Sequence, residues 1–124
     1  MSKYKYFTDK ELQCQCGCKG DNPNPEFDVL MKIVVLIREE LNEPLPITSG
    51  YRCKDHPIEA TKTTTGQHQI AAVDIGVSGS KALRLTRLIA QYPQLKGFGV
   101  KQKGEWGKRF IHIDVREKPA MWSY

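Results

Sequence analysis

Apolar residues at helical spacing mark the first third of the chain. Between Pro25 and Asn42 apolar side chains recur every three or four positions, which predicts an amphipathic helix over residues 25–42. Asn24 suits the N-cap of this helix, and Pro25 suits its first helical position. Its apolar stripe is expected to face the core and consists of Phe27, Leu30, Met31, Val34, Ile37 and Leu41.

Two further helices are predicted from their capping residues. Thr8 and Glu11 form a capping-box pattern, so a short helix should begin after Thr8 and end at the Cys-Gly segment. Another helix is predicted from Ser78 or Ser80 to about Tyr92. Its apolar residues are Leu83, Leu85, Leu88 and Ile89.

Alternating apolar and polar residues predict a set of short strands. They are expected at residues 47–49, 71–77, 97–100 and 110–115, and the last of these is predicted to be the final strand. Helices mixed with short strands predict an α+β fold, here a small antiparallel sheet flanked by helices. With 124 residues, 40% of them hydrophobic, residues 1–124 are expected to form one domain with one core.

A polar segment runs from Arg52 to Gln67 and is predicted to form one long loop. It contains Thr61 to Gly66, which offer no apolar anchor. Because loops of this length in small domains are usually functional, this segment is expected to border a site.

The net charge of +5 favours acidic partners, namely nucleic acid, anionic lipid or an anionic cell wall, although it also serves solubility. No run approaches the roughly 18 apolar residues of a membrane-spanning helix, so no membrane insertion is expected. The N-terminus lacks the apolar core of a signal peptide. We therefore expect synthesis as a soluble cytosolic chain.

The four cysteines are Cys14, Cys16, Cys18 and Cys53. The single-residue separations in Cys-Gln-Cys-Gly-Cys fit the usual spacing of structural zinc ligands poorly. A cluster around a second metal, with Cys53 as the fourth ligand, is one interpretation. Free thiols, or one disulfide to Cys53, are the others.

Metal-binding residue types lie on the strand faces turned away from the core. Asp74 has this position in residues 71–77, and His112 and Asp114 have it in residues 110–115. A buried carboxylate is costly unless it is paired or bound to metal. His68 lies just before the first of these strands. Two histidines and one aspartate suit a catalytic zinc site, in which zinc lowers the pKa of a water molecule to about 7.

Five stretches together resemble the zinc D-Ala-D-Ala carboxypeptidase family, which includes murein endopeptidases and phage endolysins. They are Ile47–Cys53, Gly66–His68, Ala72–Ile75, Gly97–Val100 and Phe110–Arg116. The N-terminal part through the long helix is similar to one branch of the family, so the resemblance covers almost the whole chain. It implies a Hedgehog/DD-peptidase-like fold and one Zn²⁺ per chain.

The resemblance also implies roles for individual residues. His68, Asp74 and His112 match the metal ligands. Arg52 matches the arginine that faces the substrate, where it would bind a carboxylate or steady the developing oxyanion. The residues implied to shape the cleft beside it or contact substrate are Ser49, Tyr51 and Gln67.

The sequence departs from the family pattern at two points that matter for chemistry. His68 and Asp74 are six residues apart with no glycine between them, a span of roughly 20 Å in an unbroken strand, so the chain must fold back between Gln69 and Ala71 if both bind one metal. Some branches carry an acid three residues before the second metal histidine, where this chain has Arg109. The predicted general base is therefore Asp114, and the alternatives are Glu105 and His56.

These observations predict a zinc metallopeptidase that acts on peptidoglycan stem peptides or cross-links at the bacterial cell wall. Phage delivery would explain its access, and the protein is expected to be a monomer or part of a phage particle. The bond cut stays open among D-Ala-D-Ala, L-Ala-D-Glu and a cross-bridge. One alternative is a non-catalytic wall-binding or tail module on the same fold. The other is a nucleic-acid-binding domain, but only the net charge supports it. We therefore expect no nucleic-acid partner.

Overall fold

The computed structural model describes residues 3–16, 20–53, 55–61 and 65–124. Within these ranges the chain forms a five-stranded sheet in the order β1-β2-β4-β3-β5. Neighbouring strands are antiparallel except for β3 and β5, which are parallel. The strands are β1 (Ile47–Ser49), β2 (Ala72–Ile75), β3 (Gly97–Lys101), β4 (Phe110–Asp114) and β5 (Ala120–Ser123).

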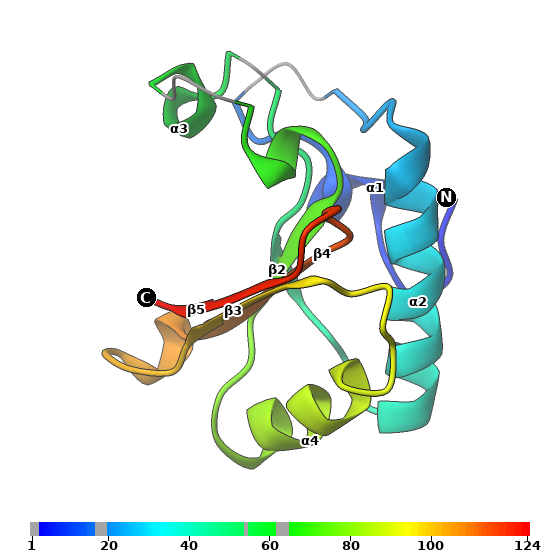
Figure 1. Cartoon of the computed structure of the whole chain (residues 1–124), viewed down its shortest axis with the longest axis vertical. Helices are drawn as coiled ribbons and strands as arrows, with labels where there is room; N and C mark the ends of the chain where they lie inside the picture. Colours follow the sequence, from blue (N-terminus) through cyan, green and yellow to red (C-terminus); the bar gives the residue numbers. More distant parts are fainter. Residues whose placement is uncertain (1–2, 17–19, 54, 62–64) are drawn as a thin grey trace.

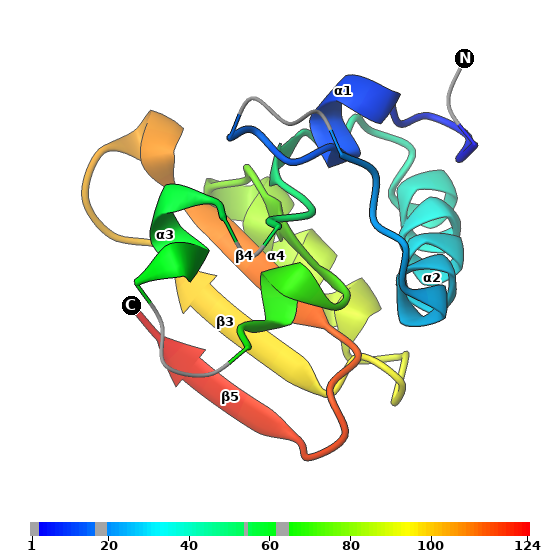
Figure 2. The same ribbon diagram turned by 90° about the horizontal axis from the view of Figure 1, so that it is seen from above.

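The helices pack on both sides of this sheet. In Figure 1 the sheet is seen almost edge-on, with α4 below it and α3 above it, and α2 runs alongside. Figure 2 shows α4 behind the sheet and the segment with α3 in front of it. The α-helices are α1 (Asp9–Leu12), α2 (Pro25–Leu41), α3 (Pro57–Ala60) and α4 (Gly79–Ile89), and the short 3-10 helices are η1 (Gln67–Gln69) and η2 (Trp106–Lys108).

The core lies between the sheet and the pair of long helices. The predicted stripe of α2 is buried, with Leu30, Met31 and Val34 fully inaccessible. It packs against one face of β2 and β4, formed by Val73, Ile75, Ile111 and Ile113, each at most 1% exposed. The α+β class predicted from the sequence is confirmed.

Three details differ from the prediction. The final strand is β5 rather than residues 110–115, and its parallel pairing makes the sheet mixed rather than antiparallel. The predicted loop contains the short helix α3, whose first turn is capped by the His56 side chain. Leu83 is exposed, because the buried face of α4 follows Ala82, Leu85 and Ile89 at helical spacing.

The opposite face of β2 and β4 carries polar side chains in a fixed register. Asp74 and His112 are directly paired across the two strands. Directly opposed side chains on one sheet face have Cβ atoms about 5 Å apart, which is close enough for their polar ends to meet. The sheet therefore brings together two residues that are 38 positions apart in the sequence.

Gly97 leaves the space that a buried carboxylate fills. It pairs with Asp114 in the neighbouring strand, and a Cβ at residue 97 would lie 1.9 Å from Asp114 Oδ1. Asp114 is fully buried, and hydrogen bonds with His112 and Arg116 hold its carboxylate in place. We expect Gly97→Ala to lower the free energy of unfolding by about 3 kcal/mol, measured by denaturant titration.

Gly107→Ala is the matched control for this substitution. A Cβ at residue 107 would meet no atom within 4 Å. The change should therefore alter the free energy of unfolding by no more than about 0.5 kcal/mol. Equal effects of the two substitutions would contradict the close approach at Gly97.

Candidate active site

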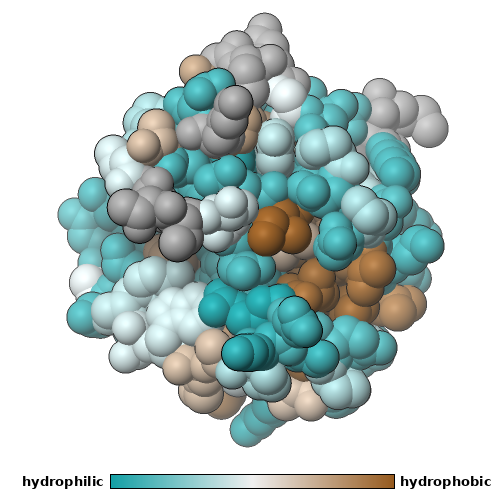
Figure 3. Space-filling view, turned by 45° about the horizontal axis from the view of Figure 1, so that its top comes forward, coloured by the Kyte–Doolittle hydropathy of each residue, from teal (hydrophilic) through white to brown (hydrophobic). Residues whose placement is uncertain are grey.

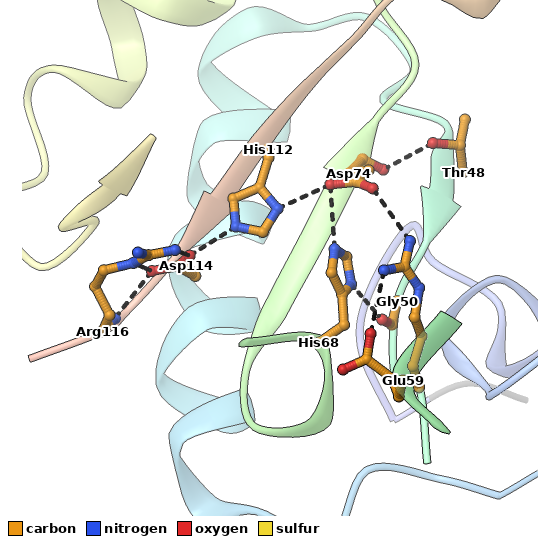
Figure 4. Close-up of polar contacts among 9 residues, drawn as sticks. Thr48, Gly50, Glu59, His68, Asp74, His112, Asp114 and Arg116 are labelled. Atoms are coloured by element: carbon orange, nitrogen blue, oxygen red, sulfur yellow. Dashed lines mark hydrogen bonds and ion pairs between the residues drawn. The ribbon is translucent and has the colours of Figure 1, made fainter. Parts of the chain in front are cut away.

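Three polar side chains converge on the face of the sheet away from the core. His112 Nδ1 lies 2.9 Å from Asp74 Oδ1, and His68 Nε2 lies 3.3 Å from the same oxygen. Figure 4 shows Asp74 between the two imidazole rings. The three residues are 4–6% exposed, so water competes little for their polar atoms.

A tight turn brings His68 to Asp74 despite the short spacing. Residues 67–69 form the 3-10 helix η1, and the N–H groups of Ile70 and Ala71 both donate to the Gln67 carbonyl. Ile70 takes up the change of direction with φ −108° and ψ −80°, so no glycine is required. The chain thus folds back between Gln69 and Ala71, as it must if His68 and Asp74 are to bind one metal.

In each histidine, the ring nitrogen that faces away from Asp74 lies within hydrogen-bond distance of an oxygen acceptor. His68 Nδ1 lies 2.8 Å from the Gly50 carbonyl oxygen, which can only accept, so Nδ1 donates in this bond and Nε2 is the nitrogen that faces Asp74. His112 Nε2 lies 2.6 Å from Asp114 Oδ2, which leaves Nδ1 facing Asp74. Histidines that bind metals are usually oriented in this way, by a hydrogen bond from the nitrogen that does not bind.

This donor set fits a zinc ion. One ligand atom from each of His68, Asp74 and His112 lies within 4.8 Å of the other two. Two imidazole nitrogens and a carboxylate oxygen are the ligands that catalytic zinc prefers, with a fourth position left for water or substrate. The three residues could therefore hold one divalent metal ion.

The electrostatics keep Asp74 ionised. Burial alone would raise the pKa of Asp74, but hydrogen bonds to His112 and His68 hold that pKa well below its usual range. For His112, burial would lower the pKa, but the carboxylates of Asp114 and Asp74 outweigh it and raise the pKa. At neutral pH the site thus presents a negative oxygen, as a cation requires.

Asp114 is held by several donors and does not face solvent. It accepts hydrogen bonds from the Arg116 backbone N–H at 3.1 Å and from the guanidinium at 2.9 and 2.7 Å. Burial would raise the pKa of Asp114, but these bonds and that of His112 keep it well below the usual range. Its side chain is fully buried, so it acts on the site through His112.

The convergent residues open into a pocket, which we call the central pocket. Its lining comes from β2, β4, β5, η1 and the segments after β1 and β4: Arg52, Gln67, His68, Asp74, Phe110, His112, Arg116, Trp122 and Tyr124. The lining therefore combines metal-ligand types, two arginines and three aromatic rings.

Arg52 is fixed at the edge of the central pocket. Its guanidinium lies 3.8 Å from Asp74 Oδ2 and 3.5 Å from Glu59 Oε2, and its backbone N–H donates to the His68 carbonyl at 2.9 Å. Glu59 is buried at the end of α3 and also accepts from Gln69 Nε2 at 3.1 Å. The buried Glu59 was not among the residues predicted from the sequence, because the segment showed no helical periodicity.

The aromatic wall was also missed by the sequence prediction. Trp122 belongs to β5 and Tyr124 follows it; the Trp122 ring centroid lies 5.1 Å from that of His112. Gly99 allows this approach, since a Cβ there would meet the indole at 2.6 Å. Two aromatic residues at a spacing of two could have indicated a strand with both rings on one face.

The other predicted residues lie outside the lining of the central pocket. Ser49 is opposite Asp74 in the neighbouring strand, and Tyr51 follows it with its N–H donating to the Leu12 carbonyl. Glu105 is exposed at the start of η2 and pairs with Lys108 at 3.6 Å. His56 accepts from the Ile58 N–H at 3.2 Å as the cap of α3.

Comparison with known proteins gives one family. A family model described as Peptidase M15 matches residues 5–114. No curated protein matches the chain. The matched range includes His68, Asp74, His112 and Arg52.

Proposed function

The chain belongs to the peptidase M15 family, and we propose that it is a zinc-dependent peptidase that hydrolyses peptide bonds in peptidoglycan stem peptides or cross-links. The observation that carries this proposal is the arrangement of His68, Asp74 and His112 in a pocket, with each imidazole oriented by a contact at the nitrogen that faces away from Asp74. The family is that of the zinc D-Ala-D-Ala carboxypeptidases.

Zinc would be held by His68 Nε2, Asp74 and His112 Nδ1. When bound, it acts as a Lewis acid and makes water a competent nucleophile at neutral pH. The protein supplies the rigid surroundings: the Gly50 carbonyl fixes one imidazole, and Asp114 fixes the other. Because both rings are buried, little reorganisation is needed when the metal binds.

Arg52 supplies a fixed positive charge beside the reacting bond. Its side chain is only 15% exposed and is held by Glu59, so the guanidinium cannot swing into solvent. A fixed cation in a water-poor site stabilises an oxyanion or a peptide carboxylate far more than it would in water. Gln67 and the aromatic wall of Trp122 and Tyr124 would border the rest of the peptide.

Asp114 has the contacts of a positioning residue. Its hydrogen bonds go to His112 and Arg116, and it is absent from the lining of the central pocket. The general-base role stays a prediction for this residue. The orienting role is supported more directly, since a carboxylate on the far nitrogen of a metal-binding histidine raises the basicity of that ligand.

Asp114→Asn is expected to weaken zinc binding by about 10- to 100-fold, because the neutral amide orients His112 less firmly. Zinc affinity is measured by competition with a chelating dye, and kcat is measured with excess zinc. Restoration of kcat by excess zinc supports the positioning role. Normal zinc affinity with a persistently low kcat would instead assign Asp114 the role of base.

The substrate class and the place of action are proposed from the family and the charge. A net charge of +5 would help the protein meet an anionic wall. Hydrophilic side chains predominate on the face shown in Figure 3, in which the α3 side is turned toward the viewer. No helix in the described ranges is long and apolar enough to cross a bilayer. Delivery by a phage, with the protein as a monomer or part of the particle, remains our proposal for its access to the wall.

A non-catalytic wall-binding module is the second candidate. It is favoured by one observation: the three candidates for a general base, Asp114, Glu105 and His56, all lie outside the lining of the central pocket. Mass spectrometry of purified murein after incubation with the zinc-loaded protein separates the two. Peptide products support the peptidase, whereas tight murein binding without any product would support the binding module.

A further inference from the structure

We propose that Cys14, Cys16 and Cys53 form a second metal site, which binds zinc through thiolates and fastens the N-terminal segment to the segment that carries Arg52. The three side chains form a compact group, in which the Sγ atoms all lie within 4.8 Å of one another. The site shares no residue with the one formed by His68, Asp74 and His112. It therefore stands or falls independently of the proposed peptidase activity.

The sulfur separations suit a metal better than a disulfide. Cys14 Sγ lies 3.6 Å and Cys16 Sγ lies 3.4 Å from Cys53 Sγ. A disulfide would require about 2.05 Å. Tetrahedral zinc with sulfur at about 2.3 Å places neighbouring sulfurs about 3.8 Å apart, so the two separations to Cys53 Sγ differ from that arrangement by only a few tenths of an ångström.

A backbone hydrogen bond links two of the three cysteines. The Cys53 backbone N–H donates to Cys14 Sγ at 3.3 Å. On binding, each thiol gives its proton to solvent and its sulfur lone pair to the metal, with no change of oxidation state.

The site would join two segments that the fold already places side by side. The Tyr51 N–H donates to the Leu12 carbonyl at 3.0 Å, and a Cβ at Gly50 would lie 2.8 Å from that oxygen. Cys53 directly follows Arg52, and the Gly50 carbonyl orients His68. A metal at these cysteines would therefore hold one end of residues 50–53 at Cys53, while the hydrogen bond to Leu12 holds the other end at Tyr51. Cys18, which the sequence groups with these residues, lies outside the described residues.

Cobalt substitution tests this proposal, first on the wild-type chain and then on one variant of the other site. The full chain is purified under reducing conditions, stripped of metal and titrated with Co²⁺. We expect thiolate-to-cobalt charge-transfer absorption in the near ultraviolet, and we expect it to persist in His68→Ala. Absence of this absorption in the folded, reduced wild-type protein would overturn the proposal.

Zinc stoichiometry gives the second readout. We expect two zinc ions per wild-type chain by elemental analysis and one in Cys16→Ser, whose side chain is less buried than that of Cys14. The Tm of the Cys16→Ser protein should fall by roughly 5 °C or more, since the metal stabilises only the folded chain. Unchanged zinc content in Cys16→Ser and in Cys14→Ser would refute the site, whatever the murein assay shows.

Discussion

His112→Ala should abolish peptide hydrolysis, with a loss of at least about a thousandfold in kcat/KM, because zinc supplies the nucleophile that water alone does not provide at neutral pH. His112 carries one of the three proposed donors and is held between Asp74 and Asp114. Removing the imidazole leaves two donors and two facing carboxylates. The measurement is the rate of murein peptide release, together with zinc content after dialysis.

His68→Ala should have the same effect by a different structural route. His68 reaches the site through the turn at η1, whereas His112 reaches it through strand register. His56→Ala is the matched histidine control, since His56 caps α3, and it should leave the zinc content unchanged. Wild-type zinc content in His68→Ala and in His112→Ala would contradict the proposed ligand set.

Arg52→Ala should lower kcat/KM by about 100- to 1000-fold while leaving zinc content close to that of the wild type. The guanidinium is 3.8 Å from Asp74 Oδ2, so it is adjacent to the donors without being one of them. Arg52→Lys keeps the charge but loses the planar fork that pairs with carboxylates, so it should recover activity only in part. Steady-state kinetics on a defined stem peptide measure both.

The control for Arg52 must separate charge at the site from charge in general. Arg87 is exposed on α4, which covers the opposite face of the sheet, so Arg87→Ala should change kcat/KM less than about threefold. Loss of Arg52 also leaves Glu59 buried without its cation, so thermal unfolding has to be measured beside the kinetics. A folded Arg52→Ala protein with wild-type kinetics would remove Arg52 from the proposed mechanism.

Periodicity in the sequence correctly predicted those helix and strand faces whose apolar side chains are buried. The stripe on α2 is buried as predicted, and the alternation in β2 and β4 separates the apolar face from the face with Asp74 and His112. Alternation places residues on a face but does not give the register of two strands. The family resemblance implied that Asp74 and His112 bind one metal, but their direct pairing across the strands came only from the structure.

Periodicity could not predict the exposed strand β5, or features that depend on backbone hydrogen bonds or on contacts between distant segments. β5 is an edge strand whose Met121 is 76% exposed, so no buried alternation marked it. The turn after His68 is made by backbone hydrogen bonds to Gln67. It contains no glycine or proline that would have marked it in the sequence. The contacts of Asp114 depend on the space at Gly97 in another strand, which a spacing rule cannot reveal.

The most direct measurement of the central claim is murein digestion by the metal-free protein before and after zinc is restored. The reduced protein is stripped with a chelator, its fold is checked by circular dichroism, and the released peptides are identified by mass spectrometry. We expect no peptide release without metal and full release once zinc occupies His68, Asp74 and His112. Equal peptide release by the metal-free protein, or none by the fully zinc-loaded protein, would contradict the proposal that zinc at these residues drives peptide hydrolysis.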